Sequence, residues 1–134
     1  MNARRPTLAL LVSITLLAGC GGGDDGEDLI AEEDLRDCVA EAGFTVETAG
    51  VPASPGLGSI TPDFRATGDG RVVVDLAVFG TTRKAERATA DVRSALAGFG
   101  AADAEVVHAR NAVAIFDRAP SGDQAAAVED CLRG

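Results

Sequence analysis

The sequence lacks several residue types on which catalysis and nucleic-acid recognition usually depend. It contains no Trp and no Tyr, and it has one His among 134 residues. Basic residues are few: the sequence has 12 Lys and Arg and 21 Asp and Glu, which gives a formal net charge of −9. Phosphate recognition needs a concentrated basic surface. We therefore expect no nucleic-acid partner.

A hydrophobic run long enough to span a membrane is also missing near the start of the chain. The apolar segment 8–19 has only 12 residues, whereas a membrane-spanning helix needs about 18 to 20. Arg4 and Arg5 precede this segment, and no acid lies among the first five residues. A basic start followed by a short apolar run is typical of a secretory signal peptide.

The apolar segment ends in Leu17-Ala18-Gly19-Cys20. These four residues resemble the lipobox of bacterial lipoproteins, in which a signal peptidase cuts before the cysteine. The resemblance covers residues 1–20 only and implies that 1–19 are a signal peptide. Cys20 would then carry a diacylglyceryl thioether, often with a further acyl chain such as palmitate on its amine.

Two or three acyl chains anchor a protein stably, whereas one does so only marginally. The resemblance therefore implies a protein held at the cell membrane, on its extracytoplasmic side, through Cys20. An ordinary signal peptide with a chance cysteine is the alternative, and export by the general secretory or the twin-arginine route stays open.

An acidic, glycine-rich tether is expected at 20–28, because 21–28 (GGGDDGED) contains no apolar residue. Nine acids fall within residues 24–41, against Arg36 as the only cation. Such a segment should be solvated and extended and should hold the domain away from an anionic surface. Calcium binding is the functional alternative, but the spacing does not match a twelve-residue calcium loop.

Residues 29–134 are expected to form one α+β domain, a small two-layer sandwich of three helices on a mainly antiparallel sheet, in the order α-β-β-β-α-β-β-α. Periodicity and turn residues predict these elements: helix 28–42, strand 44–48, loop 49–62, strands 64–67 and 71–79 around an Asp-Gly turn, helix 82–97, strands 104–109 and 112–117, and a final helix. Thr81 or Thr82 should cap the second helix, Gly98 should end it, and Ser121 with Gln124 should form a capping box for the last.

Cys38 and Cys131 remain once the lipobox cysteine is set aside. Each lies on the apolar side of its predicted helix, and an even pair in an exported protein predicts a disulfide. Two buried free thiols are the alternative. A redox site would usually show a CxxC motif, which the sequence lacks.

Catalytic, cofactor and metal patterns are not found, so we expect no cofactor, no metal and no enzyme. No GxGxxG, P-loop or GxSxG pattern is complete. His108 is expected to pair with Val113 in a hairpin that turns at Arg110-Asn111, which favours a structural or rim histidine over a catalytic one.

Both faces of the predicted sheet are largely apolar. The strand 71–79 places valines on both sides, and the second hairpin does the same. Either the chain itself covers the second face, or a protein partner, a second copy or an apolar ligand does. We therefore expect a non-catalytic binding domain of unknown specificity, the alternative being a small cell-envelope enzyme or enzyme accessory that uses carboxylates.

Overall fold

The computed structural model describes residues 28–47, 60–100 and 104–134. The predicted signal peptide, Cys20, the tether before residue 28 and most of the loop 49–62 lie outside the described residues.

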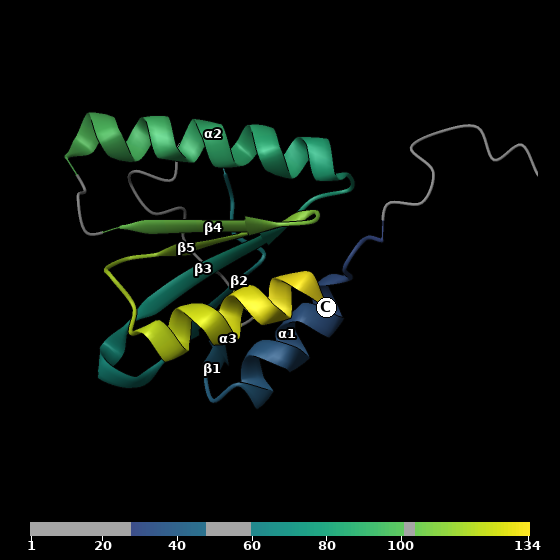
Figure 1. Ribbon diagram of the computed structural model, residues 1–134, viewed down its shortest axis with the longest axis vertical. Helices are drawn as coiled ribbons and strands as arrows, with labels where there is room; N and C mark the ends of the chain where they lie inside the picture. Colours follow the sequence, from purple (N-terminus) through teal and green to yellow (C-terminus); the bar gives the residue numbers. More distant parts are fainter. Residues whose placement is uncertain (1–27, 48–59, 101–103) are drawn as a thin grey trace, which may run out of the picture.

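Three helices and five strands make up the described chain (Figure 1). In chain order they are α1 (Glu32–Glu41), β1 (Thr45–Glu47), β2 (Phe64–Thr67), the short 3-10 turn η1 (Asp69–Arg71), β3 (Val73–Val78), α2 (Thr82–Phe99), β4 (Glu105–Ala109), β5 (Ala112–Phe116) and α3 (Gly122–Arg133). The expected α+β class and the expected order of elements are confirmed.

The five strands form one antiparallel sheet in the order β1-β2-β3-β5-β4. Two hairpins, β2–β3 and β4–β5, meet where β3 pairs with β5. The second hairpin has the predicted register, with His108 opposite Val113 and Val106 opposite Ile115.

Helices cover both faces of this sheet, so the sheet is the middle of three layers and not one of two as expected. Figure 1 shows α1 and α3 on one face and α2 on the other. The cause is the apolar character of both faces of β3 and β5, since each face must be buried against another element.

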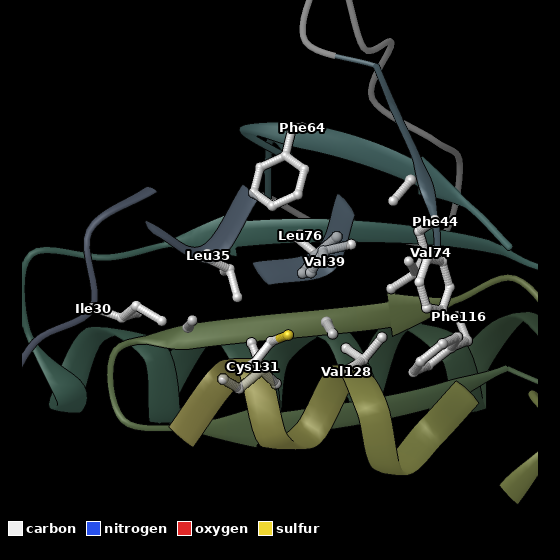
Figure 2. Packing of buried hydrophobic residues seen from close by; sticks show 14 of the residues in the cluster. Ile30, Leu35, Val39, Phe44, Phe64, Val74, Leu76, Phe116, Val128 and Cys131 are labelled. Carbon is white, nitrogen blue, oxygen red and sulfur yellow. The ribbon is translucent and has the colours of Figure 1, made fainter. Parts of the chain in front are cut away.

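The larger core lies between the sheet and the layer of α1 and α3. Figure 2 shows side chains from both helices and the central strands pointing into it. Its largest fully buried members come from five elements: Leu35, Val39, Phe64, Val74, Leu76, Phe116, Val128 and Leu132. The smaller core lies under α2 and contains Ala85, Ala88 and Val92 of the helix.

Several element boundaries differ from the predicted ones for local reasons. Helix α1 begins at Glu32 and not at residue 28, and it ends at Glu41, with Ala42 as an exposed C-cap. Strand β3 begins at Val73 because Arg71 has a positive φ of 59° in the preceding turn. Helix α2 continues past Gly98 and ends where Gly100 adopts a left-handed conformation. The caps on Thr81 and Ser121 are confirmed.

Candidate functional site

The described chain starts at the point where the predicted tether meets the domain, and the β4–β5 turn holds this start in place. Ile30 donates its backbone N–H to Asn111 Oδ1 over 2.8 Å, and Asn111 Nδ2 donates to the carbonyl of Ile30 over 3.0 Å. Asn111 Nδ2 also donates to the carbonyl of Phe79 over 2.8 Å. One buried amide thus ties the start of the domain to the end of β3.

Arg110 adds a second set of contacts to the same segment. Its guanidinium donates to the carbonyl of Asp28, lies 3.0 Å from the Asp28 carboxylate, and donates over 2.9 Å to the carbonyl of Arg133 at the end of α3. Arg110 has a positive φ of 53°, which places residues 110 and 111 in a tight hairpin turn. We call the contacts of Arg110 and Asn111 with 28–30 the turn clamp.

The predicted disulfide joins α1 to α3 in the larger core. Cys38 and Cys131 are bonded across a sequence separation of 93 residues, with their Cα atoms 5.7 Å apart. Cys131 is buried and Cys38 is partly buried. The bond therefore ties the first helix of the domain to the last, close to the segment held by the turn clamp.

The chain itself covers the apolar part of the second sheet face. Ala77, Val113 and Ile115 are buried beneath α2, together with Ile60. Of the two interpretations that the sequence left open for this face, the structure supports cover by the chain's own helix. These side chains are not available to a partner.

A partly buried ion pair occupies the same sheet face on β2 and β3. Arg65 and Asp75 are directly opposite in register, and the guanidinium donates from Nε and a terminal nitrogen to both carboxylate oxygens, over 2.7 and 3.0 Å. The Asp75 side chain is 8% exposed. The hydrogen bond that Arg65 donates to Asp75 outweighs desolvation and raises the pKa of Arg65 above its ordinary value. This pair was not predicted from the sequence.

Two further carboxylates near the sheet are engaged by backbone groups. Asp63 accepts the N–H of Val78 over 2.7 Å, and Asp117 accepts the N–H of Val73 over 2.9 Å. Burial opposes ionisation of Asp117, but its hydrogen bonds with Arg118 and Val73 outweigh this and lower its pKa. Both carboxylates therefore take structural roles.

His108 lies on the sheet face toward α2, and its ring contacts its own hairpin turn. Its Nε2 lies 3.1 Å from the carbonyl oxygen of Arg110. In the tautomer that carries its proton on Nε2, the ring donates a hydrogen bond to this carbonyl. This contact fits the structural role that the sequence favoured.

Two surface hollows lie among the described residues. One, of about 430 Å³, lies between Phe44, the η1 turn and the start of α3, where Gln124 Nε2 donates to the carbonyl of Asp69 over 2.9 Å. The other, of about 280 Å³, lies beside α2 between Phe79 and the side chains of Lys84, Arg87 and Asp91.

Among the described residues, no cluster of three or more His, Cys, Asp or Glu side chains could hold a metal ion. The helices of the described segments include none with the length and hydrophobicity needed to cross a membrane. Comparison with family models, characterised proteins and solved structures gives no match for this chain.

Proposed function

We propose that this protein is a lipoprotein anchored through Cys20 to the extracytoplasmic side of the cell membrane, and that its domain acts there by binding and not by catalysis. The observation that carries the proposal is the Cys38–Cys131 disulfide. Disulfides persist in oxidising, extracytoplasmic compartments and are rare in the cytosol. The bond uses two of the three cysteines, and the third is the lipobox residue.

The turn clamp also supports an anchored domain. A lipid tether on Cys20 would transmit any motion of the membrane to residues 28–30 at the start of the domain. Arg110 and Asn111 connect this segment to β3 and to the end of α3 through buried and charge-assisted hydrogen bonds. The disulfide then joins α1 to α3, so the start of the domain is attached to the core at two places.

Binding is favoured over catalysis because the ionisable groups brought together by the fold stabilise the fold itself. Asp75 is fully engaged by Arg65, while Asp63 and Asp117 accept backbone N–H groups. A general acid in a carboxylate enzyme needs a raised pKa and an accessible position, whereas the pKa of Asp117 is lowered. No observation on the described residues specifically supports the enzyme alternative.

The anchor is tested by Cys20→Ser in the organism that makes the protein. We expect the wild-type chain to remain with the membrane fraction after a high-salt wash and the Cys20→Ser chain to be released or to keep its signal peptide. Gly21→Ser is the matched control, because it changes the neighbouring residue and leaves the thiol. Retention of Cys20→Ser with the processed size and the same wash resistance would contradict the proposal.

A further inference from the structure

Charge is distributed unevenly between the two helical layers. The helices α1 and α3 carry eight acids and two arginines on one side of the sheet. On the other side, α2 carries four basic residues and two acids. A chain with a net charge of −9 thus has one helix with a net positive charge, and that helix forms a layer by itself.

The cations at the start of α2 do not serve the stability of the helix. Arg83 and Lys84 lie in its first turn, which contains no acid, although the positive end of a helix dipole disfavours cations there. Both side chains are exposed, as is Arg87 one turn later. Within the described part of the chain, none of the ion pairs involves these three residues. We call Arg83, Lys84 and Arg87 the basic patch.

The basic patch lies at the end of the domain where the predicted tether joins it. Asn111 connects the carbonyl of Ile30 to that of Phe79, and α2 begins at Thr82, only three positions after Phe79. In Figure 1, the start of α2, the β4–β5 turn and the described N-terminus lie toward the same end of the sheet. Seven residues (21–27) separate Cys20 from the described chain, and the eight residue-to-residue steps from Cys20 to Asp28 can span at most about 28 Å.

The opposite end of α2 carries an exposed aromatic side chain. Phe99, its last residue, is 72% exposed. The apolar face of α2 is buried against the sheet, so contact with a bilayer would be made by its exposed polar face. The acidic layer of α1 and α3 is repelled by an anionic surface, and this repulsion favours an orientation with α2 toward the membrane.

We propose that α2 faces the membrane that holds Cys20, with the basic patch contacting the phosphates of anionic phospholipids and the acidic layer turned away. This inference rests on the proposed lipid anchor, and it replaces the expectation that the acidic tether holds the domain away from an anionic surface. Each Lys or Arg close to an anionic surface contributes about fivefold to the local association. The hollow between Phe79 and the side chains of Lys84, Arg87 and Asp91 lies on the same side.

Lys84 makes this orientation measurable, because it is the only lysine in the chain. The purified lipidated protein is placed in vesicles of phosphatidylcholine with or without phosphatidylglycerol. An amine-reactive ester is added, and the modification rate of Lys84 is measured by mass spectrometry of the peptide that contains it. We expect a rate several-fold lower in the anionic vesicles and recovery of the rate at high salt, which screens the attraction.

Two charge-reversal variants test whether the protection of Lys84 depends on the basic patch or on the overall charge of the protein. Arg87→Glu should remove most of the protection of Lys84, whereas Arg133→Glu, an equally drastic change of an exposed arginine in the acidic layer, should leave it intact. Circular dichroism verifies that both variants are folded.

The outcomes also separate this inference from the proposed anchor. A lipidated protein whose Lys84 reacts equally fast in both kinds of vesicle overturns the orientation and leaves the anchor standing. In detergent, protection of Lys84 that increases with protein concentration would show that a second copy of the chain covers α2. This result would also overturn the proposed orientation. An intact mass without lipid would overturn both proposals.

Discussion

Removal of the disulfide should destabilise the domain by an amount that follows from its position in the chain. The bond closes a loop of 93 residues. In the chain-entropy model such a loop contributes about 4 to 5 kcal/mol at 25 °C. Small domains are stable by about 5 to 15 kcal/mol, so this one bond accounts for a large part of the free energy of unfolding.

The measurement compares three forms of the chain from residue 20 onward, all with Cys20→Ser. These are the oxidised protein, the same protein after chemical reduction, and Cys38→Ala/Cys131→Ala. With a urea m-value of about 1.5 kcal/mol/M, the reduced form should unfold at a urea concentration lower by about 3 M. The double variant should lose slightly more, because Cys131 is buried and its sulfur packs in the core. A shift below about 0.5 M on reduction would refute the reasoning.

Other predictions concern the turn clamp, the close packing of Gly68 against Phe44, and the decrease of stability at acidic pH. Asn111→Ala leaves the buried polar groups of Ile30 without their partner and should cost about 2 to 4 kcal/mol in urea unfolding. Gly68→Ala would place a Cβ 2.7 Å from a ring carbon of buried Phe44 and should cost about 1 to 3 kcal/mol by the same measurement, with Gly80→Ala, where the Cβ meets open space, as control. The lowered pKa of Asp117 means that its contribution is present above its unfolded pKa of about 3.9 and is lost as pH falls through the folded value. Asp117→Asn should therefore weaken the dependence of stability on pH below about 4, and an unchanged acid limb would contradict this.

The parts of the fold that local chemistry determines could be predicted from the sequence. The capping box at Ser121 and Gln124 and the cap at Thr81 lie where the residue types favour them. The two-residue turn at Arg110 and Asn111 determined the register of the second hairpin, including His108 opposite Val113. The disulfide followed from cysteine count and helix periodicity.

The parts that depend on tertiary contacts could not be predicted in this way. A three-residue Asp-Gly loop would place Arg65 opposite Val73, but the loop runs from Gly68 to Val72, so Arg65 pairs with Asp75. The start of α1 was placed too early because the sequence does not reveal that Asn111 holds Ile30 in an extended segment. The third layer likewise depends on tertiary contacts, because α2 packs over β4 and β5 on the sheet face opposite α1 and α3.

The central claim, a lipid anchor on an exported and disulfide-bonded domain, is tested most directly by the intact mass of the protein extracted from membranes. We predict a chain that begins at Cys20, carries a diacylglyceryl group with or without a further acyl chain, and gains the mass of two hydrogen atoms on reduction. A chain that begins elsewhere, or that carries no lipid on Cys20, would contradict the account.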